Sequence, residues 1–114
     1  IMADDNAALV CVGQVPEGCF VDVLSGDVDS LVDAARNARE LGQEVFEQKG
    51  TEATTLFIDC ISRVLFLEGE FQRELEAVAD SQMIGALTLG EIANNGQDYL
   101  EFYNKTAVVG ILGG

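Results

Sequence analysis

The sequence predicts an α/β (α+β) domain with a mixed β-sheet of about five strands and two main helices packed on it. Two observations predict this class: short segments rich in β-branched residues alternate with longer segments whose apolar residues recur at helical spacing. The apolar share of 48% in 114 residues is enough for one principal core. We therefore expect residues 1–114 to form a single domain with the order β-β-α-β-α-β-β.

The N-terminal part of the chain predicts a β-hairpin. Residues 7–13 form a short β-rich run, and residues 19–24 alternate in the manner of a strand. Pro16 and Gly18 lie between them with the spacing of a tight turn. The two runs are therefore expected to pair with each other.

A long amphipathic helix is predicted over residues 28–48, with Asp27 as its N-cap. One face carries its apolar residues, which are Leu31, Ala34, Ala35, Ala38, Leu41 and Val45. Gly42 either shortens this helix or marks close packing on a sheet. A lysine and a glycine at positions 49 and 50 are typical of a helix end.

The second half of the chain contains the remaining predicted elements. We expect strands at residues 54–58, 83–89 and 107–112, a second helix at residues 70–80, and a polar loop at residues 94–98. Residues 59–68 are ambiguous, because their apolar side chains suit either a helical turn or a buried loop.

The charge balance disfavours nucleic acid and membrane surfaces as partners. Twenty acidic residues against six basic ones give a net charge of −14, which repels phosphate backbones and anionic lipid headgroups. No apolar run approaches the roughly 20 residues of a membrane helix, and the N-terminus does not resemble a signal peptide. We therefore expect a cytoplasmic protein that contacts neither nucleic acid nor membrane. A chain that opens at Ile1 is also expected to be a fragment of a larger protein.

The cysteine and histidine content limits the chemistry. The three cysteines, Cys11, Cys19 and Cys60, lie in apolar surroundings, and their odd number predicts buried thiols and not a disulfide framework. The absence of histidine excludes Ser-His-Asp and Cys-His catalysis and His-containing zinc sites. The acidic residues of the second helix, Glu74 among them, are expected to lie around a solvated surface and not to form a metal site. No cofactor is expected.

Two predicted strands end in residues that suit ligand binding. Ligands of open α/β sheets tend to bind beyond the carboxyl ends of strands. Arg63, after the first of these strands, offers a planar fork for a carboxylate or phosphate, and Glu91, after the second, could accept from an amine. Together they could hold a zwitterion such as an amino acid. Gly90 and Asn104 are expected to shape the loop, and Cys60 to line the pocket.

A purely structural interpretation of the same residues also stands. Arg63 and Glu91 could pair with each other, or with Glu68 or Asp59, and serve only to orient loops. Cys60 could be a small core residue, and it has no base beside it that would make it a nucleophile.

Several segments, in this order and spacing, resemble the FIST C-terminal domain. The resemblance runs from about residue 26 to residue 112. The matching segments are residues 26–30, 57–63 and 71–75, Gly85 with residues 90–92, and residues 104–106. One departure is Tyr103, which stands where the family usually has a histidine before the asparagine.

This resemblance implies a non-enzymatic sensory domain of a signal-transduction protein that binds a small polar ligand, such as an amino acid or related metabolite. The ligand-binding residues would be Cys60, Arg63, Gly90, Glu91 and Asn104. It also implies a companion FIST N-terminal domain or other signalling domains in the parent protein. The alternative is a structural or dimerisation domain that binds no ligand, since an uncovered sheet edge or helix face would favour a homodimer. A small enzyme that uses Cys60 or the pair Arg63 and Glu91 has the least support.

Overall fold

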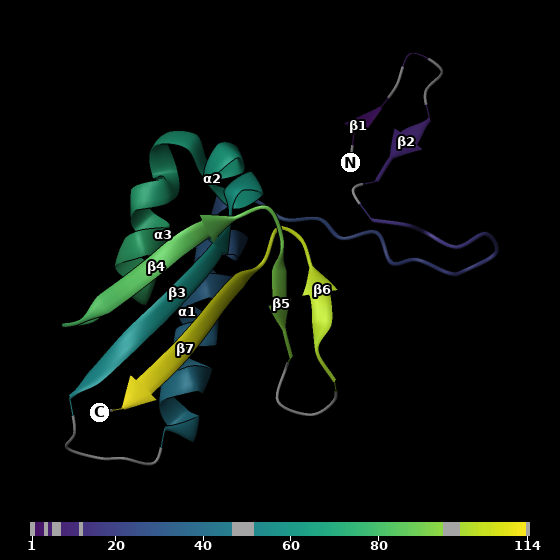
Figure 1. Ribbon diagram of the computed structural model, residues 1–114. Helices are drawn as coiled ribbons and strands as arrows, with labels where there is room; N and C mark the ends of the chain where they lie inside the picture. The colour runs from purple at the N-terminus through teal and green to yellow at the C-terminus, as the bar shows by residue number, and fades with distance from the viewer. Residues whose placement is uncertain are drawn as a thin grey trace.

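The computed structural model describes residues 2–3, 5, 8–11, 13–46, 52–94 and 99–113 (Figure 1). Its elements in chain order are β1 (Met2–Ala3), β2 (Leu9–Val10), α1 (Val28–Val45), β3 (Ala53–Cys60), α2 (Ile61–Leu67), the 3-10 helix η1 (Glu68–Glu70), α3 (Phe71–Val78), β4 (Met83–Thr88), β5 (Glu91–Ala93), β6 (Glu101–Tyr103) and β7 (Ala107–Gly113).

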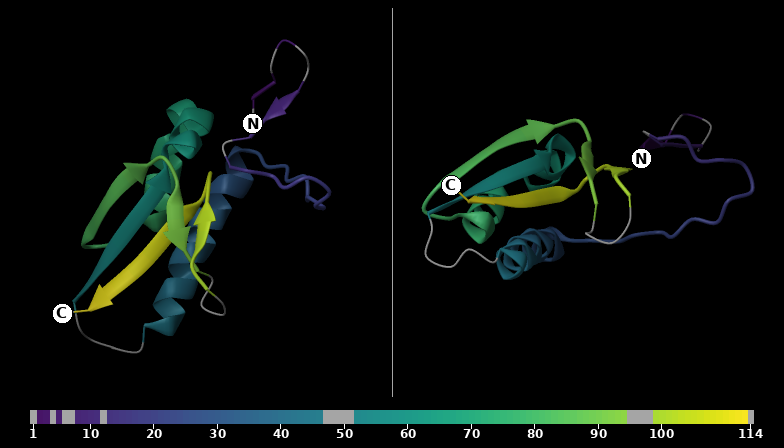
Figure 2. Two further views of the ribbon diagram at one scale, coloured as in Figure 1. Left: turned by 45° about the vertical axis from the view of Figure 1, so that its right-hand side comes forward. Right: turned by 60° about the horizontal axis from the view of Figure 1, so that its bottom comes forward.

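A mixed sheet with strand order β4-β3-β7 forms the centre of the domain. Strand β3 is parallel to β4 and antiparallel to β7. Because β3 lies between these two strands, it carries the most buried side chains of the sheet. Helices α1 and α3 lie together against one face of this sheet (Figure 2). The core forms between them from Ala35, Phe57 and Val78. The predicted α+β class and mixed sheet are therefore confirmed.

Local sequence explains how α1 begins and why it lies close to the sheet. Asp27 accepts a hydrogen bond from the Ser30 backbone N–H, and the Ser30 hydroxyl accepts one from the Asp27 N–H, both at 2.8 Å, so the predicted N-cap is confirmed as a capping box. A Cβ added at Gly42 would lie 3.3 Å from Cγ1 of Ile111 on β7. Gly42 therefore marks close packing of α1 on the sheet. Residues 49–50, the expected helix end, lie outside the described residues.

The ambiguous segment after β3 is helical. Helix α2 follows β3 without an intervening loop, and η1 connects it to α3. Because β3 and β4 are parallel, the chain must cross over between them, and these helices form that crossover. The second predicted helix is confirmed as α3.

The predicted N-terminal hairpin is wrong. Strand β2 pairs antiparallel with β1, and residues 19–24 belong to no strand. These residues lie away from the body of the domain (Figure 1), and no strand of the described residues pairs with them. A sequence with strand propensity still needs neighbouring strands to pack against, so propensity alone does not produce a strand at residues 19–24. The prediction of three buried thiols is also wrong, because Cys11 and Cys19 are exposed and only Cys60 is buried.

A second hairpin was not predicted from the sequence. Strands β5 and β6 pair antiparallel, with Glu91 opposite Tyr103, and lie beyond the end of the central sheet (Figure 1). Each strand has only three residues, too few to show an alternating pattern. Most of the predicted loop at residues 94–98 lies outside the described residues. No helix in the described ranges has the length and apolar character needed to cross a membrane.

The core predicts the effect of a small truncation in α3. Val78 is fully buried against the sheet and α1, so Val78→Ala should lower the free energy of unfolding by about 2 kcal/mol through lost apolar burial and a residual cavity. Urea unfolding measures this loss. The matched control is Val45→Ala at an exposed position in the last turn of α1, which should change stability by less than about 0.5 kcal/mol. Equal losses from both variants would contradict this assignment of the core.

Candidate functional site

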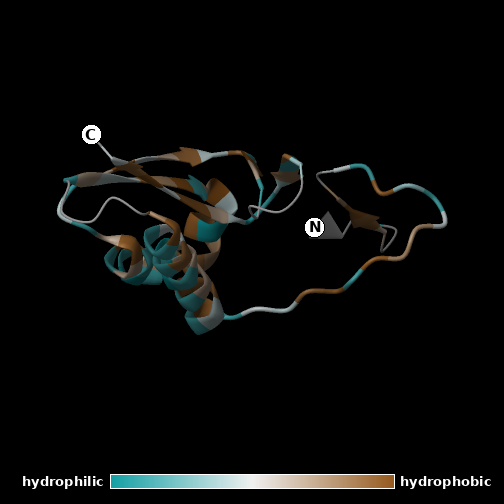
Figure 3. Ribbon diagram, turned by 90° about the horizontal axis from the view of Figure 1, so that it is seen from below, coloured by the Kyte–Doolittle hydropathy of each residue, from teal (hydrophilic) through white to brown (hydrophobic). Residues whose placement is uncertain are grey.

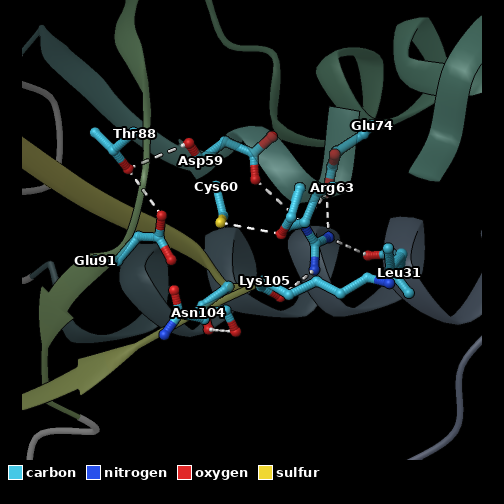
Figure 4. Close-up of polar contacts among 11 residues, drawn as sticks. Leu31, Asp59, Cys60, Arg63, Glu74, Thr88, Glu91, Asn104 and Lys105 are labelled. Carbon is cyan, nitrogen blue, oxygen red and sulfur yellow. Dashed lines mark hydrogen bonds and ion pairs between the residues drawn. The ribbon is translucent and has the colours of Figure 1, made fainter. Parts of the chain in front are cut away.

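The carboxyl ends of β3 and β4 meet at one edge of the sheet, and the candidate residues gather there. Asp59 and Cys60 end β3, and Arg63 follows in the first turn of α2. Glu91 begins β5, directly after the turn that ends β4. Figure 4 shows Arg63, Cys60 and Glu91 in one region beside Asn104. The structure therefore brings the predicted site residues to the same end of the domain.

Arg63 is buried, and its guanidinium is fully engaged by the protein. Nε donates to Glu74 Oε1 at 2.8 Å, and Nη2 donates to Glu74 and to the Leu31 carbonyl. Nη1 donates to the Lys105 carbonyl at 3.4 Å, and Nε lies 3.1 Å from Asp59 Oδ1 (Figure 4). Of the structural alternatives, pairing of Arg63 with Asp59 is confirmed. Arg63 thus joins α1, α2, α3, the end of β3 and the turn before β7.

Glu74 is the main partner of Arg63, and the sequence analysis placed it wrongly on a solvated surface. Its side chain is fully buried. Helix α3 turns this carboxylate inward because the buried guanidinium needs an opposite charge. One signal in the sequence points to it: Glu74 lies four residues before the apolar Val78, so both residues share the face of α3 that packs inward.

Glu91 is also buried, and only one of its oxygens is satisfied. Thr88 Oγ1 donates to Glu91 Oε1 at 2.8 Å. Among the described residues Glu91 Oε2 has no hydrogen-bond partner, and the same holds for Asp59 Oδ2 and Glu74 Oε2. A buried oxygen without a donor destabilises the fold. The site therefore has free capacity to accept hydrogen bonds.

Negative charge exceeds positive charge in this buried cluster, which contains Asp59, Glu74, Glu91 and Arg63. Burial raises the pKa of Asp59 to about 7, with a further increase from the charge of Glu74, and these effects outweigh the attraction of Arg63. Asp59 therefore binds a proton near neutral pH, and the cluster would also be relieved by an added positive charge.

The small residues of the predicted site have clear structural roles. Gly90 has φ of +154°, and a Cβ there would lie 2.6 Å from the Phe102 ring, so this turn requires glycine, as expected. Cys60 is buried, and its Sγ lies 3.1 Å from Ser62 Oγ. Its thiol packs within the domain at the start of α2.

A groove of about 660 Å³ lies between the C-terminal half of α1, strand β7 and the β5–β6 hairpin. Its walls are mainly apolar, with polar groups from Asn94, Tyr103 and Thr106. None of the five predicted site residues lines it. Glu91 is nevertheless adjacent: it projects on the same face of β5 as Ala93, and it lies opposite Tyr103 in the hairpin, and both of these residues line the groove.

Asn104 follows Tyr103, the last residue of the β5–β6 hairpin. It is exposed in the turn between β6 and β7, and its carbonyl accepts a hydrogen bond from Thr106 Oγ1 at 3.3 Å. Its neighbours Tyr103 and Thr106 line the groove on either side of the turn. An apolar groove with polar groups from Asn94, Tyr103 and Thr106, and with a buried carboxylate on the neighbouring strand residue Glu91, suits a small amphipathic ligand. No group of histidine, cysteine or acidic side chains within the described ranges is arranged to hold a metal ion.

Comparison with known families agrees with the resemblance in the sequence. A family model described as the FIST C domain matches residues 1–94, which is more than half of the chain. The match begins earlier than the expected start at residue 26, and it ends before residues 104–106. No match was found among curated proteins or among solved structures.

The charge cluster predicts how stability depends on pH. The folded-state pKa of Asp59 lies above its ordinary value of 3.8, so the folded state keeps a proton that the unfolded state loses. This group therefore makes the protein less stable as pH rises from about 4 to about 7, with no further change above that range. Asp59→Asn removes this dependence. From pH 5 to pH 8 the stability of the variant relative to the wild type should rise by up to about 3 kcal/mol, measured by urea unfolding.

The control for this experiment is Asp5→Asn, which changes an exposed carboxylate outside the cluster and outside residues 19–24. Its stability relative to the wild type should stay constant over the same range of pH. A parallel pH profile for Asp59→Asn and the wild type would show that Asp59 does not titrate with a raised pKa.

Proposed function

Because the chain belongs to the FIST C domain family, whose members are sensory domains of signal-transduction proteins, we propose that it binds a small polar ligand and passes the signal to a partner domain. The partner is the FIST N-terminal domain or another signalling domain of the parent protein, and the site of action is the cytoplasm. The ligand is an amino acid or a related metabolite.

The observation that carries this proposal is the free oxygen of Glu91 beside the groove. Glu91 Oε2 is buried and has no donor among the described residues. A protonated amine supplies such a donor and also balances part of the excess negative charge of Asp59, Glu74 and Glu91. The ligand therefore carries an amine that reaches Glu91 and an apolar body that lies along the groove.

The other site residues act around this contact. Asn104 is exposed in the turn between Tyr103 and Thr106, which line the groove, so its amide can donate to a ligand carboxylate. Arg63 shapes the site through its hydrogen bonds to Glu74 and to the Lys105 carbonyl, next to Asn104. Gly90 sets the turn that directs Glu91 inward, and Cys60 supports the end of β3.

Ligand binding can produce a signal because the groove lies between separate elements of the fold. Its walls come from α1, β7 and the β5–β6 hairpin. A ligand that contacts all of them favours the conformation in which the hairpin lies close to α1, and it shifts the population towards that conformation. A partner domain that contacts α1 or the hairpin would detect this shift.

A thermal-shift screen with amino acids tests the function, and leucine with two analogues tests the charge contact. The analogues are 3-methylbutylamine, which lacks the carboxylate, and 4-methylpentanoate, which lacks the amine. At about 100 times the dissociation constant a ligand stabilises the native state by about 2.7 kcal/mol, a readily visible rise in Tm. We expect responses only to compounds with an amine, and Glu91→Gln should abolish them.

Two further variants make this test specific. Glu44→Gln makes the same chemical change on α1 outside the groove and should respond as the wild type does. Ala38→Phe fills the groove from α1 without changing any charge, and it should also abolish the response. A response of Glu91→Gln equal to that of the wild type, or an equal response to 4-methylpentanoate, would contradict the proposed contact.

A further inference from the structure

Residues 19–24, the exposed arm, present apolar side chains to solvent. They are extended and lie outside every strand, between the N-terminal β1–β2 pair and α1. Val23 and Leu24 are 94% and 91% exposed, and Phe20 is exposed to the same degree. Figure 3 shows this apolar stretch well separated from the sheet and helices. A segment of this character gains stability only when another surface covers it.

Strand β4 has an edge that pairs with no strand of the described residues. It is hydrogen-bonded to β3 on one side, and it is an outer strand of the three-stranded sheet. Its sequence, Met83–Thr88, contains no charged residue and no proline, which are the usual means of preventing edge-to-edge pairing. Ile84 and Ala86 are exposed, and they alternate with Gly85, which lies opposite the core residue Phe57 of β3, so they project on the face of the sheet away from the helices.

A second apolar groove adjoins the β4 edge. It has a volume of about 250 Å³ and is lined by residues 83–87 of β4 together with Phe57, Phe71 and Leu75. It therefore runs along β4 beside α3. An aromatic side chain from an added strand would find an apolar site there.

The arm and the edge are complementary. Both have six residues, a strand length of about 20 Å. Residues alternate between the two faces of a strand, so Phe20 can enter the groove beside α3 while Val21 and Val23 cover the open face next to Ile84 and Ala86. In the chain itself the arm runs from the start of α1 away from β4 (Figures 1 and 2). A second copy can bring the two together.

We propose that two copies of this chain exchange their arms, with residues 19–24 of each copy pairing along the β4 edge of the other. Phe20 is the anchor, and it fills the groove lined by Phe71 and Leu75 of the second copy. The contact is reciprocal, as the symmetry of a homodimer requires. It does not involve the groove proposed for the ligand.

The charge of the chain gives this dimer a characteristic response to salt. Each copy carries −14, so the two copies repel each other, while the arm contact itself is mainly apolar. Added salt screens the repulsion. Dimerisation should therefore become stronger from 50 mM to 500 mM sodium chloride.

Sedimentation equilibrium of the full chain tests the exchange. The wild type should be a dimer, and Phe20→Ser should raise its dissociation constant at least about tenfold, because the anchor is lost. The matched control is Leu65→Ser, which removes an exposed apolar side chain from α2, and it should leave the constant unchanged. A monomeric wild type at high concentration, or equal dimerisation of Phe20→Ser, would overturn the proposal.

A mixing experiment identifies the two halves of the contact. Val21→Pro prevents the arm from pairing, and Ala86→Lys places a charge on the β4 edge, so each variant alone should be monomeric. Their mixture should form a heterodimer through the intact arm of the Ala86→Lys copy and the intact edge of the Val21→Pro copy. Dimers of Val21→Pro alone would overturn the proposal. So would a monomeric wild type whose arm resists proteolysis, because that result would place the arm on its own domain.

Discussion

The buried guanidinium of Arg63 is the contact on which this end of the domain depends. Its hydrogen bonds reach Glu74 on α3, the Leu31 carbonyl on α1 and the Lys105 carbonyl before β7, and its ion pair reaches Asp59 at the end of β3. A planar group with donors along its edges can make these contacts at once, whereas an ammonium group cannot. Loss of Arg63 would leave buried carboxylates without a counter-ion. It would also remove the contacts that join these elements at this end of the domain, whereas apolar packing joins them in the core.

One guanidinium is not enough to neutralise the acidic residues around it. Asp59 responds by binding a proton, as its raised pKa shows, and Glu91 keeps an oxygen without a donor among the described residues. Proton binding and amine binding therefore relieve the same excess of negative charge, so each should weaken the other. A sensory domain built in this way would respond to its ligand more strongly above pH 7 than below it, because protonated Asp59 removes part of the attraction for a cation.

The sequence predicted much of the fold, and the errors share a physical cause. The N-cap at Asp27, the presence of helix α1 and the run that forms β3 depend on local signals, and all three were predicted correctly. The predicted apolar face of α1 was only partly correct, because Ala34, Leu41 and Val45 are exposed and Val32 is buried. The arm at residues 19–24 has the local pattern of a strand, but a strand also requires a neighbour, and sequence spacing does not say whether one is present. Arg63 and Glu91 were placed at the correct end of the sheet. The role of Glu74 was missed because a carboxylate on an amphipathic helix is usually solvated, and only its buried counter-ion turns it inward.

The distribution of charge over the molecule favours association through its strands. Acidic residues are plentiful on the helices, whereas β4 and β7 contain none. A net charge of −14 keeps the chain soluble and opposes contact over most of its surface, but it does not protect an uncharged strand edge at short range. Contact is therefore least opposed where backbone donors and acceptors are unpaired and apolar side chains are uncovered. The exposed arm carries a strand-forming sequence of the length that this edge requires. The structural and the sensory interpretations of the domain are therefore compatible, because the surface proposed to join copies of the chain is separate from the groove proposed to hold the ligand.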